Sequence, residues 1–137
     1  RERKTVPDHR FASDAVQPAD AGLDITRSAV AVEMRSYRHA RDTRDWSAAW
    51  HHLGRAHIIA QSIFRLHLVS HAAMLTFAIS RRDVREIIGQ LLRIALVPLG
   101  ALTGRLPTGN TGRARISAFA PMPVPEDLLP YLRLDRP

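Results

Sequence analysis

The chain contains no cysteine among its 137 residues. This absence excludes disulfides, thiolate metal sites and cysteine nucleophiles, and it fits a cytoplasmic protein. Aromatic residues make up only 6% of the sequence, and the basic residues do not alternate with aromatic ones as they would on a surface that stacks bases. A nucleic-acid partner is therefore disfavoured.

Long apolar runs are also missing. The longest one, from Ile94 to Leu102, has nine residues and includes Pro98. A membrane-spanning helix needs about 20 apolar residues, so the sequence predicts no membrane span. No segment has the pattern of a signal peptide.

Acidic residues are outnumbered, with 13 Asp and Glu against 20 Lys and Arg, which gives a net charge of +7. Such an excess implies attraction to nucleic acid, anionic lipid or an acidic protein face. The basic residues are scattered along the chain and form no single run. Charge alone therefore leaves the partner open.

The chain divides into three parts by composition. Residues 1–23 are polar and show no sustained period, which predicts an arm that cannot bury enough surface to order itself. We expect this arm to contact a protein partner. Residues 24–104 show a helical period and form the predicted domain. Residues 105–137 are a loop and a Pro-rich tail that we expect to pack on the helices.

Four helices are predicted from apolar residues spaced three and four apart. The first covers about 27–42, the second starts after a capping Asp45, and the third covers about 62–80. The fourth starts at Asp83 and ends before Pro98. The apolar residues expected to be buried in the third helix, besides a histidine, are Phe64, Leu68, Leu75 and Ala78, and those in the fourth are Val84, Ile87, Leu91, Ile94 and Ala95.

A weak internal repeat has an offset of 38 residues. It places Arg44-Asp45-Trp46 over Arg82-Asp83-Val84, and Leu53 over Leu91. The segment that follows Asp45 is similar to the second helix of a tetratricopeptide repeat, a unit of 34 residues. Since the connections are short, we predict an all-α fold of four antiparallel helices in two tetratricopeptide-like hairpins, covered by a wrapped, extended C-terminal tail.

Three histidines fall on the apolar faces of these helices. His67 and His71 are four residues apart, so they are neighbours on one helical face and can chelate one ion. A turn near Gln61 and Ser62 would fold His57 back to the level of His67. The sequence therefore predicts a site for a divalent transition metal at His57, His67 and His71.

Another interpretation of the histidines stays open. A buried histidine is commonly a neutral core residue that hydrogen-bonds a neighbour. No pair of carboxylates suited to acid–base catalysis is visible, and Asp45, Asp83 and Glu86 are explained by helix capping and the helix dipole. Ser62 and Ser70 lie near the histidines without an acid to orient a base. The sequence thus makes no claim that the protein is an enzyme.

A turn-rich loop follows the helices. Gly109 and Asn110, with Arg113 close behind, could bind an anion through backbone N–H groups and positive charge. The alternative is that the glycines serve only a turn with positive φ.

The order of several motifs resembles a family of small bacterial proteins called domain of unknown function 3703. The resemblance covers about residues 29–132. It implies a helical protein in which the three histidines, Asn110 and the tail belong to one shared feature, and it brings no established activity, substrate or cofactor. The motifs are Leu53-Gly54-Arg55-Ala56-His57-Ile58, His71-Ala72-Ala73-Met74-Leu75, Gly109-Asn110-Thr111-Gly112 and Pro121-Met122-Pro123-Val124-Pro125.

Two hypotheses for the function follow. In the first, the protein is a histidine-rich module that binds a metal as a sensor, carrier or cofactor site. Three nitrogen ligands would leave a coordination position open, so metal-dependent catalysis stays possible. In the second, the protein is a basic accessory subunit that docks on a larger complex through its arm and tail, and its histidines are structural.

Overall fold

The structure is a computed structural model that describes residues 18–105 and 107–133. This part of the chain contains five α-helices, one 3-10 helix and no strand, which confirms the all-α class. Residues 1–17 of the predicted arm lie outside the described residues. The elements are α1 (Pro18–Asp42), α2 (Trp46–Ala60), α3 (Phe64–Ser80), α4 (Val84–Thr103), η1 (Glu126–Leu128) and α5 (Leu129–Arg133).

Helix α1 begins nine residues earlier than the apolar period predicted. Pro18 suits a first helical position, because the N–H that proline lacks would have no partner there. Thr26 is fully buried, and its hydroxyl donates a hydrogen bond to the carbonyl of Gly22, one turn earlier. Residues 18–23, which were assigned to the arm, are therefore helical.

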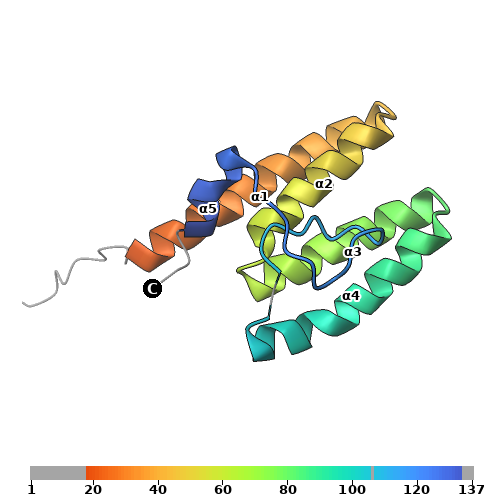
Figure 1. Ribbon diagram of the computed structural model, residues 1–137. Helices are drawn as coiled ribbons and strands as arrows, with labels where there is room; N and C mark the ends of the chain where they lie inside the picture. Colours follow the sequence, from red (N-terminus) through yellow and green to blue (C-terminus); the bar gives the residue numbers. More distant parts are fainter. Residues whose placement is uncertain (1–17, 106, 134–137) are drawn as a thin grey trace, which may run out of the picture.

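The helices pack in neighbouring pairs. Helix α1 lies along α2, α3 lies along α4, and α2 also contacts α3 (Figure 1). Phe77 is the centre of one apolar cluster, with the rings of Tyr37 and Trp50 at 5.6 and 4.9 Å from its own. A second cluster joins α1 and α2 to Leu128 of η1. The antiparallel, tetratricopeptide-like arrangement of the pairs stays a prediction.

The two turns that join the paired helices have the same backbone conformation. Arg44 and Arg82 have φ angles of 60° and 55°, and each precedes an aspartate. Asp45 and Asp83 both accept a hydrogen bond from the backbone N–H three residues ahead, which caps the next helix. The 38-residue repeat is therefore present in the turns. It does not extend to packing, since Leu53 is fully buried whereas its counterpart Leu91 is 53% exposed.

Helix α3 begins two residues later than predicted. His71 and Ala78 are buried as expected, whereas Leu68 is half-buried and Phe64 is 46% exposed. The buried face is rotated from the predicted one, because it is set by contacts with α2. It consists of His67, Ser70, His71, Met74, Phe77 and Ala78.

Helix α4 does not end before Pro98. It continues to Thr103 and ends at Gly104, whose φ of 66° closes the helix with a left-handed residue. Pro98 is exposed, so the carbonyl that loses its partner there can bond to water instead.

The predicted orientation of α4 was also wrong. Val84 and Leu91, expected in the core, are 65% and 53% exposed, and Ala95 is exposed. The reason is that α4 packs its inner face partly against the polar loop of residues 107–120, whose backbone offers hydrogen bonds rather than apolar surface. Its buried residues are Glu86, Gln90, Arg93 and Val97.

Within the described residues, α4 is the one helix long and apolar enough to cross a membrane by length and composition. Only 22% of its 18-residue apolar window is buried against the rest of the protein. Length and composition alone are weak evidence for a membrane span, because helices of soluble proteins also meet these two criteria. The absence of a membrane span stays a prediction.

Candidate metal centre

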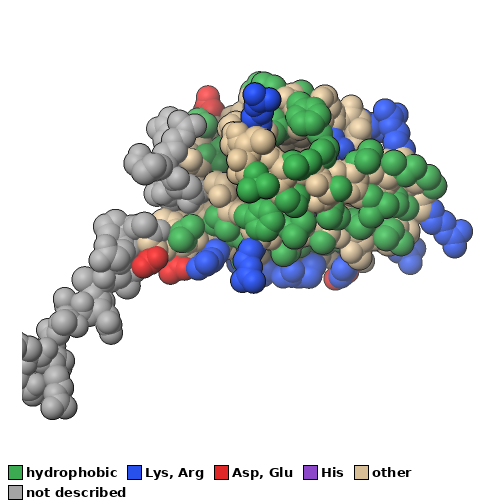
Figure 2. Space-filling model, turned by 90° about the horizontal axis from the view of Figure 1, so that it is seen from below, with side chains coloured by type: hydrophobic (Ala, Val, Ile, Leu, Met, Phe, Trp, Pro, Cys, Tyr) green, Lys and Arg blue, Asp and Glu red, His purple; other side chains and the backbone are tan. Residues whose placement is uncertain are grey.

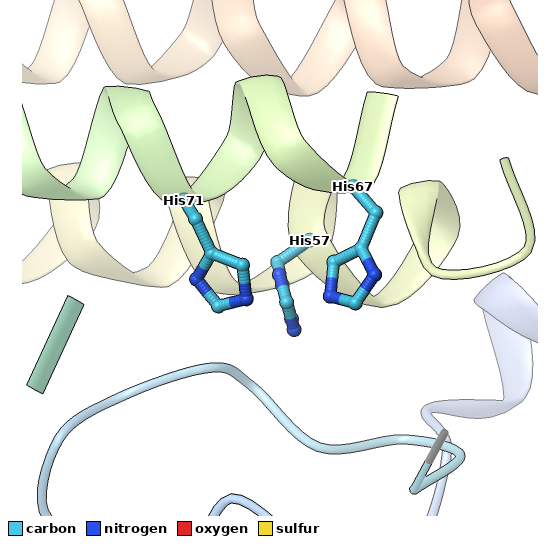
Figure 3. A group of neighbouring side chains, drawn as sticks. All are labelled: His57, His67 and His71. Atoms are coloured by element: carbon cyan, nitrogen blue, oxygen red, sulfur yellow. The ribbon is translucent and has the colours of Figure 1, made fainter. Parts of the chain in front are cut away.

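The structure brings the three predicted histidines together. His57 lies in the last turn of α2, and the connection at residues 61–63 leads directly into α3, where His67 and His71 are one turn apart. Their ring centroids are 4.8 Å (57–67), 4.5 Å (57–71) and 5.0 Å (67–71) apart. All three are buried, with at most 5% exposure. Each ring has one nitrogen that lies within 4.8 Å of the corresponding nitrogens of the other two rings (Figure 3).

The hydrogen bonds of Gln90 fix the tautomer of His71. The amide nitrogen of Gln90 donates to Glu86 Oε1 and to the carbonyl of Gly112, both at 2.8 Å. Because these partners can only accept, the amide oxygen must face His71, whose Nδ1 lies 2.7 Å away. Nδ1 therefore carries the proton. His71 Nε2 keeps its lone pair and is turned toward His57 (Figure 3).

A similar chain of bonds fixes His57. The hydroxyl of Ser70 donates to the carbonyl of His67 at 2.7 Å, so its oxygen accepts from His57 Nδ1 at 3.0 Å. On the other side, Gln61 Oε1 accepts the N–H of Gly109, which places the amide nitrogen 3.5 Å from His57 Nε2. The Ser70 contact requires His57 Nε2 to be the nitrogen with the lone pair. The Gln61 amide nitrogen is held mainly by the carbonyls of Pro107 and Asn110, at 3.0 and 3.3 Å.

His67 is held less firmly than the other two. Its Nδ1 is buried and has no hydrogen-bond partner. Its Nε2 is turned toward the other rings (Figure 3). Two of the three imidazoles thus have a second group that fixes their orientation, as metal-binding histidines ordinarily do, and the third has none at Nδ1.

Burial keeps all three imidazoles neutral. Loss of solvation lowers the pKa of His67 and of His71 to about 4, and it lowers the pKa of His57 well below its usual value. The neighbouring histidines and the Arg93 guanidinium add to the shift at His57. At neutral pH the cluster therefore presents neutral nitrogen donors, the form that binds a metal ion.

A buried carboxylate supports the cluster from behind. Glu86 is 1% exposed and accepts hydrogen bonds from Gln90 Nε2, from the N–H of Ala114 at 3.0 Å and from Arg113 Nε at 3.2 Å. Glu86 is thereby linked to His71 through the side-chain amide of Gln90. The prediction that the helix start explains Glu86 was incomplete. The sequence did contain a sign of the contact between Glu86 and Gln90, namely their spacing of four residues, which makes them neighbours on one helical face.

The predicted loop residues hold the tail in place. Asn110 donates from Nδ2 to the carbonyls of Ser117 and Ala120 at 2.8 Å and accepts from the N–H of Gly112 at 2.9 Å. The Gly109 N–H bonds to Gln61, as described above, and the Arg113 guanidinium lies 3.8 Å from the centroid of the Trp50 ring. These partners support the tail-loop role. Anion binding at this loop stays a prediction.

Gly112 lies directly against His57. It has a φ of 77°, and a Cβ at this position would be 3.0 Å from the imidazole ring. Arg93 secures the same loop, because its guanidinium donates to the carbonyl of Arg113 at 2.8 Å and to that of Ile116. The loop therefore closes over the histidines at van der Waals distance.

The remaining space beside the histidines is a cavity of about 310 Å³. The three rings and Asn110 line one part of it, and apolar side chains of α4 line another. Leu99 and Phe119, which also line it, are 57% and 69% exposed. The cavity is thus large enough for a small molecule to reach the histidines.

The other histidines are not part of the cluster. His39 and His51 are exposed, and His9 lies outside the described residues. His52 is half-buried, with its Nδ1 2.8 Å from Glu33 Oε2. Glu33 also accepts from Arg55.

The comparison with known families finds one that matches most of the chain. The model described as "Protein of unknown function (DUF3703)" matches residues 24–132. The chain belongs to this family. The DUF3703 match includes α2, α3 and α4 and the closing loop, and therefore every residue of the cluster. No curated protein and no solved structure matches the chain.

Proposed function

We propose that the protein is a binding module for a divalent transition metal, held by Nε2 of His57, His67 and His71. The observation that carries the proposal is the pair of hydrogen-bond chains that leaves His57 and His71 with lone pairs on Nε2. A structural core histidine also bonds a neighbour through one nitrogen, but it does not require the second nitrogens of three rings to lie within 4.8 Å of one another. Soft and borderline ions such as zinc, copper, nickel and iron suit imidazole ligands.

The size of the cluster supports the proposal. The nitrogens lie within 4.8 Å of one another, whereas zinc–nitrogen bonds of about 2.0–2.1 Å in a tetrahedron require about 3.4 Å. Movements of each nitrogen toward the common centre by up to about 0.8 Å would close this difference. The ring of His67, which has no partner at Nδ1, has the most freedom to move.

Three nitrogen ligands leave a coordination position for an additional ligand. The cavity beside the histidines offers room for it, and its wall includes Leu96, Leu99 and Phe119. A metal there would supply a Lewis acid or a site for an exchangeable ligand. The chain's own contribution is to hold three neutral donors in a mostly apolar surrounding, as suits a sensor, a carrier or a cofactor site.

A basic accessory subunit is the second candidate. In it the histidines are structural, and the N-terminal arm and the C-terminal tail dock on a larger complex in the cytoplasm. The tail does offer an exposed aromatic residue, Phe119 at 69%. Deleting residues 1–17 would remove the partner in this case and would leave metal binding unchanged.

We also propose that α1–α2 and α3–α4 are two antiparallel hairpins of the tetratricopeptide kind. The support is the repeated turn, in which Asp45 and Asp83 cap the second helix of each pair after an arginine with positive φ. In such an arrangement the metal site lies where the two hairpins meet.

Elemental mass spectrometry tests the metal proposal. Protein purified without a histidine tag and reconstituted with Zn²⁺, Ni²⁺, Cu²⁺ or Fe²⁺ should hold close to one equivalent of one of these ions after desalting. The variant His57→Ala, His67→Ala, His71→Ala should hold none. The control is His39→Ala with His51→Ala, which removes exposed histidines and should leave the metal content unchanged. Equal metal in both variants, or none in the parent, would contradict the proposal.

A further inference from the structure

Helix α4 carries an apolar stripe on its outer side. Apart from the adjacent Leu91 and Leu92, its residues recur at spacings of three, four and seven, which places them on one helical face. Their exposed fractions range from 53% to 84%. Seen from the side on which α4 lies, the protein shows a broad apolar surface (Figure 2). Soluble monomers rarely leave such a surface uncovered. This outer stripe consists of Val84, Ile88, Leu91, Leu92, Leu99 and Leu102.

The charge of the protein is concentrated in the same half. Residues 61–125 contain eight arginines, no lysine, and two acids, Asp83 and Glu86, so they hold +6 of the total charge of +7. Glu86 is buried and pairs with Arg113, and Asp83 caps α4, so the exposed arginines on either side of the stripe outnumber the acids near them. Exposed arginines lie at both ends of the stripe, namely Arg81, Arg82 and Arg85 at its start and Arg105 after its end.

We propose that the outer stripe docks the protein on an anionic lipid surface. The leucines and valine of α4 would enter the boundary between headgroups and acyl chains, and the flanking arginines would bind lipid phosphates. An apolar helical face with basic residues beside it is the arrangement that binds such surfaces.

The charge distribution favours lipid over a second copy of the chain. A symmetric contact between two stripes would bring two surfaces of the same strong positive charge together, and like charges oppose association. An anionic bilayer instead neutralises the arginines while it covers the stripe.

The polar inner face of α4 favours a helix that lies on the membrane surface over one that crosses the membrane. Glu86, Gln90 and Arg93 on this face are bonded to the loop of residues 107–120 and to α3. A spanning orientation would separate these polar groups from their partners in hydrocarbon, at high cost. Docking leaves them in place. It also brings the lipid close to the histidine cavity, because Leu99 belongs to the stripe and lines that cavity.

Vesicle flotation of the full chain tests the proposal. The protein should float with vesicles of phosphatidylglycerol and phosphatidylcholine, and stay in solution with phosphatidylcholine alone. Leu91→Ser with Leu102→Ser should weaken the binding about tenfold or more, because two apolar anchors are lost. The matched control, Ile25→Ser with Val32→Ser, changes two half-exposed apolar residues of α1 and should bind like the parent.

A second pair of variants tests the arginines. Arg82→Gln with Arg85→Gln should weaken binding about 25-fold, since each basic residue near an anionic surface contributes about a factor of five. Arg35→Gln with Arg38→Gln on α1 is the control at equal net charge. Circular dichroism confirms that each variant is folded. The proposal is overturned if neither vesicle binds the parent, if control and test variants lose binding equally, or if the leucine variant instead abolishes a dimer seen by sedimentation equilibrium.

Discussion

At the scale of single residues, the orientation of each imidazole depends on one neighbour. Ser70 accepts from His57, and Gln90 accepts from His71. Each neighbour is itself fixed by a bond to a group that can only accept. The two rings therefore present the same nitrogen to the centre without any adjustment of tautomer. Such outer partners commonly change metal affinity tenfold to a hundredfold, although they do not touch the ion.

Replacing Ser70 by alanine isolates this effect. The variant loses the acceptor of His57 Nδ1, so we expect metal affinity to fall about tenfold, measured by competition with a chelating dye. Stability should fall by only about 1 kcal/mol.

Ser80→Ala is the matched control for Ser70→Ala. Its hydroxyl also donates at 2.7 Å to the carbonyl three residues earlier, that of Phe77, on the same helix. Because Ser80 is exposed at the end of α3, a smaller loss of stability is expected, with unchanged metal affinity. Equal metal affinity in the two variants would contradict the orienting role of Ser70.

At the scale of elements, the helices differ in how far their sequences predict their bounds and buried faces. The start of α2 and its core positions Ala49, Leu53 and Ala56 were predictable, because an aspartate cap precedes a face that packs on other helices. The face of α4 was not predictable, because what covers it is a polar loop distant in sequence. Its inward residues Glu86, Gln90 and Arg93 look like surface residues until that loop is placed.

The candidate site shows the same limit. The spacing of His67 and His71 and the turn before α3 were enough to predict that the three histidines meet. The roles of Ser70, Gln61 and Gln90 were not predictable, because the tautomer of each ring depends on side chains from three elements at once.

The loop of residues 107–120, which closes over the histidines, offers a test at this scale. Gly112→Ala places a Cβ against His57 at a residue with φ of 77°. Gly104→Ala has a similar φ of 66° but no atom within 4 Å of the new Cβ. We expect both variants to lose about 1 kcal/mol of stability from backbone strain, and Gly112→Ala to lose more because its Cβ would lie 3.0 Å from the His57 ring. Isothermal titration with the metal should show weaker binding for Gly112→Ala alone, and equal binding by both would mean that the loop does not position His57.

At the scale of the whole molecule, the protein has two unlike halves. One half holds the aromatic cluster around Phe77 and the cluster around Ile59. The other half holds buried polar groups, most of the positive charge and the uncovered apolar stripe of α4. The histidines lie at the boundary. Three neutral imidazoles buried there also make global stability depend on pH.

Stability should decrease in mild acid. The unfolded histidines protonate near pH 6.5, whereas burial lowers the pKa of His67 and His71 to about 4 in the folded protein. Between these values the unfolded chain binds more protons, so stability is greatest above about pH 6.5 and declines toward pH 4. The decline is at most about 1.4 kcal/mol per pH unit for each histidine.

Urea unfolding of the metal-free protein at pH 7 and pH 5 measures this decline. We expect His67→Leu to reduce this decline, because it removes one of the histidines whose pKa is lowered in the folded protein. His51→Leu, which replaces an exposed histidine, should leave it unchanged. A parent protein with the same stability at both pH values would mean that the histidines are not buried in neutral form.

The central claim is that three histidine nitrogens share one metal ion. The most direct test is a crystal structure of the reconstituted protein with diffraction data collected at the absorption edge of the bound metal. The account predicts a single strong anomalous peak about 2.0–2.1 Å from Nε2 of His57, His67 and His71, with any further ligand on the cavity side. No peak at the cluster, or a peak only at other side chains such as His51 and His52, would contradict it.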